Sequence, residues 1–522
     1  MSQHQGTPRP RRDDGRPGQS GGGVRRNAQG RERNRGGGTG QRQFSSSAPA
    51  QRSRRADPAR LVAFNVLRAV SSADAYANLV LPGLIREQRL DRRDAAFATE
   101  LAYGTLRAQG SYDAILAECV DRPLSSLDPA VLDSLRLGAH QVLGMRVAAH
   151  AALDESVSLT RAVIGAGPSG LVNAVLRKVS AHSLDEWLDE LTARTGDAVE
   201  QQALRYAHPA WVVRAFRQAL VGHGRQASEI EELLSADNDA PVVNLVALPA
   251  LAGPEDLDGT GAESGPLVED SWLSAGGDLA RIDAVRRGVV RVQDVGSQLV
   301  ARALAAAPVT GGTSEGEQWL DLCAGPGGKA ALLAALAAGQ GASLLANEAQ
   351  VHRAELVRKA LAPVPSDSWE VRAGDGRDVG RLTPGRFDRV LVDVPCSGLG
   401  ALRRRPEARW RKTPADVAEL GPLQRQLLDS ALDATRPGGV VAYVTCSPHL
   451  AETRMVVDDA VRKRADVEVI EAGSVIDSVA LPETLAAAHG DYVQLWPHQH
   501  GTDAMFLALL RKTPTSPATP ND

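Results

Sequence analysis

The sequence predicts a multidomain protein with an all-helical N-terminal domain and a doubly wound, Rossmann-like α/β domain in its C-terminal half. From about residue 58 to 179, apolar residues recur at helical spacing and no strand-like alternation interrupts them. From about residue 288, short apolar runs alternate with segments of helical length, which is the pattern of an open sheet covered by helices. At 522 residues the chain is long enough for two or three domains.

Composition divides the chain further. The first 55 residues combine Gly, Ser, Gln and Arg with almost no large apolar side chains, so they cannot offset the entropy lost on ordering. Between the helical and α/β regions, helical spacing around Trp187 gives way to a strand-like run at 241–248. The predicted segments are a disordered Arg/Gly-rich tail (1–55), the helical domain (56–180), a small α/β connector or RNA-contacting region (181–287), the α/β domain (288–513) and a flexible tail (514–522).

Charge is spread unevenly along the chain. The formal net charge is -4, but residues 1–55 hold thirteen Arg, no Lys and three acids, which gives +10 there and -14 for the remainder. Such a tail suits loose contact with phosphates through counterion release, and it equally fits a solvated extension without function. Basic surface on the folded body must therefore be local.

Several classes of protein are disfavoured by the sequence. No uncharged apolar run approaches the length of a membrane span, and the first residues lack the apolar core of a signal peptide. We therefore expect a cytoplasmic protein that contacts no membrane; the sequence gives no indication of oligomeric state. Four scattered cysteines with no CxxC pair indicate reduced thiols and no metal site: Cys119, Cys323, Cys396 and Cys446.

The strands of the α/β domain are predicted from apolar runs that end in polar or Gly-rich turns. Helices of sufficient length separate them, for example at 349–362 and 415–435. The expected strands are 319–323, 343–347, 369–373, 389–394, 440–446 and 504–510.

Three of these strands end in groups that suit an adenosine-containing ligand. A Gly-rich turn at 321–329 follows the first strand, Glu348 follows the second and Asp375 the third. Ligands of open α/β sheets bind at the carboxyl ends of the strands, where a Gly-rich turn admits close backbone contact and carboxylates accept bonds from ribose hydroxyls. The turn lacks the G-x-G-x-x-G spacing of dinucleotide enzymes, and both carboxylates also fit a role as helix caps.

Two further strands end in cysteines, Cys396 and Cys446. A lone cysteine after a strand is more often a small core residue, but two at corresponding ends face the same crevice. A thiolate that adds to carbon 6 of cytosine makes carbon 5 nucleophilic toward the methyl group of a sulfonium cofactor. Nearby Lys329 favours the thiolate, Asp393 suits the ring nitrogen or amino group, and a base must remove the proton on carbon 5.

The motifs on these strands resemble a known family. Residues 58–512 are similar to the NusB-domain-containing RNA 5-methylcytosine methyltransferases, the RsmB/Sun (Fmu) family of small-subunit (16S) ribosomal RNA enzymes. The most specific motifs are DVPCSGLG (393–400) and VTCS (444–447). The helical region resembles the RNA-binding fold of the antitermination factor NusB through Arg60 and the stretches 93–107, 135–159 and 170–179. Supporting matches in the α/β region are 292–304, 321–330, 402–410, 431–439 and 500–512.

The resemblance implies a class I S-adenosylmethionine methyltransferase domain with RNA as its partner. It makes Cys446 the nucleophile, Cys396 the thiol that assists product release, Asp393 a contact to the cytosine ring and Lys329 a catalytic-site lysine. The chain departs from the family at Gly325, where a second alanine is usual, and at Glu348, where aspartate is common. The cofactor-binding residues that it implies are Cys323, Ala324, Gly325, Pro326, Gly327, Gly328, Lys329, Glu348, Asp375 and Asp393.

We therefore predict an S-adenosylmethionine-dependent RNA (cytosine-5) methyltransferase that acts on 16S ribosomal RNA through a covalent intermediate. An unpaired or flipped-out cytosine is required, because a stacked base hides carbon 6. Another RNA substrate (transfer RNA or large-subunit ribosomal RNA), a noncatalytic RNA-binding or ribosome-assembly factor, and a redox dithiol protein are the alternatives. Five arginines beside the Cys396 segment are expected either to hold the RNA backbone or to form an exposed helix start: Arg403, Arg404, Arg405, Arg409 and Arg411.

Overall fold

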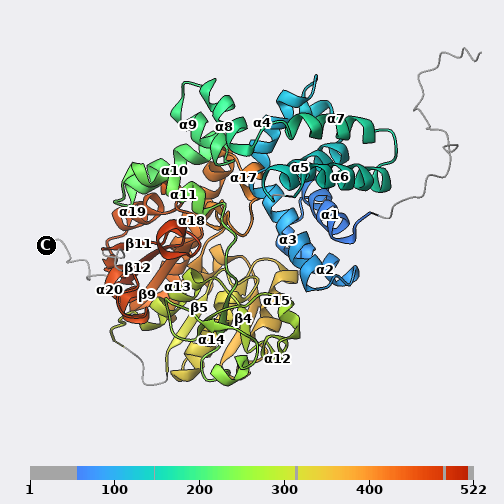
Figure 1. Ribbon diagram of the computed structural model, residues 1–522. Helices are drawn as coiled ribbons and strands as arrows, with labels where there is room; N and C mark the ends of the chain where they lie inside the picture. Colours follow the sequence, from blue (N-terminus) through green and yellow to red (C-terminus); the bar gives the residue numbers. More distant parts are fainter. Residues whose placement is uncertain (1–55, 146, 312–315, 486–489, 515–522) are drawn as a thin grey trace, which may run out of the picture. The chain divides into compact units, whose positions relative to one another are not determined.

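The computed structural model describes residues 56–145, 147–311, 316–485 and 490–514 (Figure 1). The described residues belong to one compact unit. The two predicted tails, 1–55 and 514–522, lie outside the described residues apart from Pro514, so the expectation for them stays a prediction.

The N-terminal region is helical throughout, as predicted. Asp57 and Asp128 accept hydrogen bonds from backbone N–H groups of the first turns of two helices, and each is followed by a proline at the first helical position. The helices bury apolar stripes in two adjoining clusters. Their bounds are α1 Pro58–Ala73, α2 Ala77–Glu87, α3 Arg92–Arg107, α4 Gln109–Cys119, α5 Pro129–Leu143, α6 Ala149–Val163 and α7 Ser169–Val179.

The connecting region has a helical half and a sheet half. Its helices are α8 Leu184–Ala193, α9 Ala198–Arg205, α10 Ala210–Gly222 and α11 Ile230–Ala236. A small antiparallel sheet of order β2-β3-β1-β4 follows, and the short helix α12 (Asp283–Arg287) lies directly before its last strand. The strands are β1 Asn244–Ala247, β2 Glu263–Ser264, β3 Ser271–Leu273 and β4 Val290–Val292.

The C-terminal region is built on a larger sheet of order β10-β12-β9-β8-β5-β6-β7, with β11 paired to β12. From β9 to β7 all neighbours are parallel, whereas β12 runs antiparallel to β9, β10 and β11. Strand order reverses between β5 and β8, which is where open α/β sheets form a ligand crevice. The strands are β5 Gln318–Asp321, β6 Ser343–Glu348, β7 Trp369–Ala373, β8 Phe387–Asp393, β9 Thr435–Thr445, β10 Val467–Ile470, β11 Tyr492–Gln494 and β12 Phe506–Lys512.

All six predicted strands form, with ends shifted by a few residues, while β10 and β11 were not predicted. Helices cover both faces of the sheet, and each face has its own apolar cluster. On one face lie α13 Val295–Ala306, α14 Gly328–Gly339, α15 Val351–Leu361 and α20 Ala472–Val479. On the other lie α16 Val379–Leu382, α18 Pro414–Ala434 and α19 Arg454–Lys463.

Two short helices lie in connecting segments, α17 Ala408–Arg411 and α21 Pro497–His500. Figure 1 shows α17 beside the helices of the N-terminal region, although it belongs to the segment that follows β8. Among the described residues, no helix combines the length and the apolar character that a membrane crossing needs.

Candidate active site

The Gly-rich turn connects β5 to α14 at the carboxyl edge of the sheet. Gly327 has φ 109°, a left-handed conformation that glycine adopts freely, and an added Cβ would lie 2.5 Å from the Cβ of Ala360 on α15. Gly328 begins α14, and an added Cβ there would meet no described atom within 4 Å beyond its chain neighbours. The side-chain position of Gly328 therefore borders open space at the first turn of α14, and the starts of helices after such turns are a common place for ligands to bind.

Glu348, at the end of β6, fixes this turn. Its carboxylate accepts hydrogen bonds from the N–H groups of Gly325 (3.0 Å) and Gln350 (2.9 Å), and its side chain is only 5% exposed. Arg353 on α15 lies 3.6 Å from the same carboxylate and donates to the carbonyl oxygen of Gly325 at 2.6 Å. The predicted contact of Glu348 with a ribose stays a prediction, and the structure adds a role in shaping the turn.

Two more groups at this edge fit an adenosine-containing ligand. The buried amide of Asn347 donates to the carbonyl oxygens of Leu322 (3.1 Å) and Gly374 (3.0 Å), but its Oδ1 has no hydrogen-bond partner among the described residues. Asp375, after β7, is 41% exposed, and hydrogen bonds from Arg377 lower its pKa. An open turn, a buried acceptor without a partner and an ionised, accessible carboxylate together fit the donor pattern of an adenosine group.

A charged cluster lies between the cofactor turn and the thiols. The Nζ of Lys329 lies 2.9 Å from Oδ2 of Asp393, at the end of β8. Burial opposes the charge of Lys329, but the charge and hydrogen bond of Asp393, together with other nearby groups, outweigh burial and raise the pKa of Lys329. Desolvation, followed by the nearby charge of Asp393, raises the pKa of buried Asp321 to about 8. Near pH 7 the cluster therefore contains a lysine cation and a protonated Asp321.

The structure brings the two predicted thiols together. The Sγ atoms of Cys396 and Cys446 lie 3.3 Å apart, although the residues are fifty positions apart in the chain. The hydrogen bond to Cys446, followed by desolvation, raises the pKa of Cys396 well above its ordinary value. Desolvation also raises the pKa of Cys323 well above its ordinary value. Cys396 and Cys323 therefore stay neutral thiols at neutral pH, and Cys396 has a proton to donate toward Cys446.

Comparison with known proteins now identifies the family. The profile of the family described as "16S rRNA methyltransferase RsmB/F" matches residues 308–511, and that of the NusB family matches 57–181. "Ribosomal RNA small subunit methyltransferase B" of Pseudomonas putida is 30% identical over 471 residues, 88% of this chain and 99% of that one. The chain belongs to the RsmB/F methyltransferase family.

Other relatives agree with this assignment. A protein of Mycobacterium tuberculosis (strain ATCC 25618 / H37Rv), which its name describes only as a candidate methyltransferase, is 48% identical over 88% of this chain and 98% of its own. The crystal structure of PH0851 shares the fold, with a TM-score of 0.71, 20% identity and coverage of 88% of this chain and 99% of that one. Membership in the RsmB/F family makes this chain an S-adenosylmethionine-dependent ribosomal RNA methyltransferase.

The arginine-rich segment of this RsmB/F chain corrects the sequence-based interpretation. Arg409 is fully buried, and its guanidinium bonds the side-chain oxygen of Asn238 (2.8 Å) and the carbonyl oxygen of Ala207 (3.1 Å). Arg403 and Arg404 pair with Asp503, and Arg404 also pairs with Asp294. Protein groups therefore hold these three arginines. Arg411 is of intermediate exposure and donates to carbonyl oxygens that follow α1. Of the five arginines expected to hold RNA or start an exposed helix, only Arg405 is exposed.

Sequence reasoning missed four residues of the site. Asp321, Asn347 and Arg353 lie within the expected cofactor region, but nothing in the sequence marks their burial or pairing. Glu452 is fully buried and accepts hydrogen bonds from serines next to both thiols. Its only sequence signal is its position six residues after Cys446.

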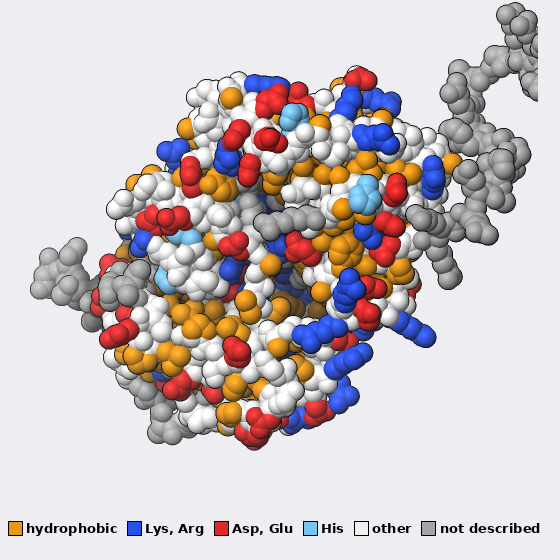
Figure 2. Space-filling view, in the orientation of Figure 1, with side chains coloured by type: hydrophobic (Ala, Val, Ile, Leu, Met, Phe, Trp, Pro, Cys, Tyr) orange, Lys and Arg blue, Asp and Glu red, His pale blue; other side chains and the backbone are white. Residues whose placement is uncertain are grey.

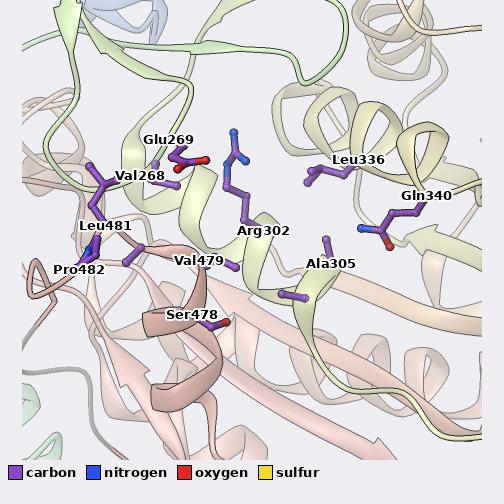
Figure 3. Close-up of a pocket in the computed structure, with 12 residues that line it drawn as sticks. Val268, Glu269, Arg302, Ala305, Leu336, Gln340, Ser478, Val479, Leu481 and Pro482 are labelled. Carbon is purple, nitrogen blue, oxygen red and sulfur yellow. The ribbon is translucent and has the colours of Figure 1, made fainter.

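A pocket of about 320 Å³ lies elsewhere on the RsmB/F domain. Figure 3 shows Arg302 and Ala305 of α13 opposite Leu336 and Gln340 of α14 across it, with the 478–482 segment closing one side. None of the thiol or cofactor residues lines it, so it is separate from the candidate active site. Among the described residues no cluster of three His, Cys, Asp or Glu side chains has the arrangement of a metal site.

Proposed function

We propose that this chain methylates carbon 5 of a cytosine in small-subunit (16S) ribosomal RNA, with Cys446 as covalent nucleophile and Cys396 as its assisting thiol. The observation that carries the proposal is the 3.3 Å approach of the two Sγ atoms beside the Lys329–Asp393 pair. A single buried cysteine fits a core role, whereas two thiols in contact next to a cation and a carboxylate fit covalent catalysis.

The thiols divide the reaction between them. The Cys446 thiolate forms a bond from Sγ to carbon 6 of the ring, and the π electrons of the carbon 5–carbon 6 bond become available at carbon 5. The positive charge of Lys329, which lies 2.9 Å from Asp393, is the group that we expect to assist the attack. S-adenosylmethionine, when bound, supplies the electrophilic methyl group that carbon 5 attacks. Once a base has removed the proton on carbon 5, that electron pair re-forms the double bond and the Sγ–carbon 6 bond breaks.

The neighbouring residues position the ring and the cofactor. Asp393, held by Lys329 at 2.9 Å, is placed to contact ring N3 or the amino group, and the Lys329 cation beside it opposes the negative charge that thiolate addition puts on the ring. The segment from Cys323 to Lys329 with Glu348 and Asp375 holds the cofactor at the neighbouring strand ends. Cys396, a neutral thiol, can return a proton to Cys446 when product is released.

Local basic surface is available for the RNA. Arg86, Arg89, Arg92 and Arg93 are exposed at the end of α2 and the start of α3. Figure 2 shows Lys and Arg side chains gathered at the lower right of the molecule, around the place where Figure 1 has α2. Phosphate contacts from such a group position an RNA without reading its sequence. The RsmB/F profile and the name of the Pseudomonas putida relative favour small-subunit ribosomal RNA over another RNA.

The test compares alanine variants at the two thiols. Cys446→Ala should abolish methyl transfer, because carbon 5 is then never activated. Cys396→Ala should still attack and methylate but release RNA poorly, so a protein–RNA adduct that survives denaturing electrophoresis should accumulate and disappear in the double variant. Cys119→Ala, the same change in the helical region, is the control.

Opposite results would overturn the assignment. An adduct with Cys446→Ala but none with Cys396→Ala would reverse the roles, and full activity in both variants would exclude a covalent mechanism. Bisulfite sequencing of cellular RNA with and without the protein then identifies the RNA and the cytosine, and a mark that persists in 16S RNA without the protein would exclude that substrate.

A further inference from the structure

The two thiols lie on loops that the main sheet does not join. β8 and β9 are paired up to the hydrogen bond from the N–H of Val394 to the carbonyl oxygen of Val444 (3.1 Å). Cys396 and Cys446 each lie two residues beyond this last rung. A backbone hydrogen bond from Gly400 to the carbonyl oxygen of Cys446 (2.9 Å) ties the loops further along. Directly beyond the thiols, the Oγ atoms of Ser397 and Ser447 lie 3.2 Å apart, at a position where one shared partner can hold both loops.

The side chain of Glu452 occupies that position. It is fully buried, and its carboxylate accepts from the N–H of Ser397 (2.7 Å), the Oγ of Ser397 (2.5 Å) and the Oγ of Ser447 (2.7 Å). Ser397 directly follows Cys396 and Ser447 directly follows Cys446. One carboxylate therefore bonds both loops one residue away from each sulfur atom.

Glu452 is itself held in place. Its backbone carbonyl oxygen accepts from the hydroxyl of Tyr443 on β9 (2.7 Å), and Gln424 of α18 donates to both Glu452 Oε1 (3.3 Å) and the carbonyl oxygen of Pro395 (2.9 Å). Among the described residues Glu452 has no ion-pair partner, and hydrogen bonds from neutral donors satisfy its carboxylate instead. A buried carboxylate that accepts from several donors in this way forms strong, directional hydrogen bonds and makes a rigid bridge.

We propose that Glu452 is a positioning residue of the reaction, which bridges the two catalytic loops and keeps the Cys396 and Cys446 sulfur atoms at their working separation. The inference rests on the proposed function, in which both thiols act on the same ring. Displacing a reacting group by about 1 Å typically costs on the order of 100-fold in rate, so the bridge controls turnover without touching substrate.

Two substitutions separate the bridge from the charge. Glu452→Ala removes every bond between the carboxylate and the two serines. In Glu452→Gln the amide oxygen takes the place of Oε1, and the NH2 group takes the place of Oε2 and donates to the two serine hydroxyls, which can also accept. The glutamine variant therefore keeps the bridge and removes the charge. Glu419→Ala, the same truncation at an exposed position on α18, is the matched control.

The experiment measures the spacing of the thiols without relying on catalysis. Diamide oxidises two neighbouring thiols to a disulfide and takes up their two hydrogens, and mass spectrometry of peptides follows the formation of the Cys396–Cys446 disulfide. We expect Glu452→Ala to slow this disulfide by at least tenfold and to lower kcat by about 100-fold. Its S-adenosylmethionine Kd should stay that of the wild type. Glu452→Gln and Glu419→Ala should resemble the wild type in all three measurements.

Each outcome decides the inference. A wild-type rate of disulfide formation in Glu452→Ala overturns the positioning role even if activity is lost. If Glu452→Gln loses as much disulfide rate and kcat as Glu452→Ala, the charge of the side chain and not its bridging hydrogen bonds is responsible. If Glu452→Ala binds no cofactor and melts early, Ser397→Ala with Ser447→Ala takes its place, and normal disulfide formation in that pair overturns the inference. Failure of the wild type to methylate cytosine overturns the proposed function. The disulfide rates still test whether Glu452 sets the distance between the two sulfur atoms.

Discussion

Replacing Gly325 by alanine tests how the cofactor turn is shaped. An ideal Cβ at Gly325 would lie 2.1 Å from Oε2 of Glu348 and 2.9 Å from Nε of Arg353, both inside contact distance. The Glu348 carboxylate must therefore retract, which breaks its hydrogen bond with the N–H of Gly325. Because this bond involves a charged group, we expect Gly325→Ala to lower the free energy of unfolding by about 2 kcal/mol.

The two departures from the family pattern explain each other. The family that the sequence resembles commonly has alanine at position 325 and aspartate at position 348. Aspartate is shorter by one methylene group, about 1.5 Å, and so makes room for the alanine Cβ. In the double variant Gly325→Ala with Glu348→Asp, the loss should therefore be smaller than the sum of the single losses by about 1 kcal/mol.

Urea unfolding of the full chain measures the free energy of unfolding of the wild type, of each single variant and of the double variant. Gly328→Ala is the control for stability, because a Cβ there meets open space in the same turn. Wild-type stability in Gly325→Ala, or single losses that add within about 0.5 kcal/mol, would refute the steric reasoning.

Three further predictions concern single residues. Asp375→Ala should weaken S-adenosylmethionine binding in calorimetry, and an unchanged Kd would remove this carboxylate from the site. The folded chain holds the Asp321 proton up to about pH 8, whereas the unfolded chain releases it near its ordinary pKa of 3.8, so the free energy of unfolding falls as pH rises between these values. Asp321→Asn should reduce this fall when urea unfolding is measured at pH 5 and at pH 8. An unchanged difference between the two pH values would contradict the protonation of Asp321. Arg409→Ala should cost about 3 kcal/mol in unfolding free energy, since its buried acceptors lose their donor, whereas exposed Arg405→Ala should cost little; equal losses in the two variants would show that burial is not the cause.

The sequence by itself determined the architecture and the main candidates for the chemistry. Helical periodicity and alternating strands are local patterns, so they predicted the helical region and every strand that borders the site. Cys396 and Cys446 could be placed in one crevice from sequence, because parallel strands end at the same edge of a sheet. The Gly-rich turn, Glu348 and Asp375 were located by the same rule.

Only the tertiary structure decided which polar groups pair with each other. The sequence predicts Arg409 to be one of five arginines that hold RNA or start an exposed helix. Its hydrogen-bond partners, Ala207 and Asn238, instead come from a segment about 170 to 200 residues earlier in the chain. Glu452 bonds Ser397 across 55 residues. Burial and electrostatic pairing depend on which distant segments meet, and periodicity along the chain carries no information about those meetings. The protonation state of Asp321 and the spacing of the thiols therefore follow from packing, because desolvation and hydrogen bonding arise only when the fold excludes water from these groups.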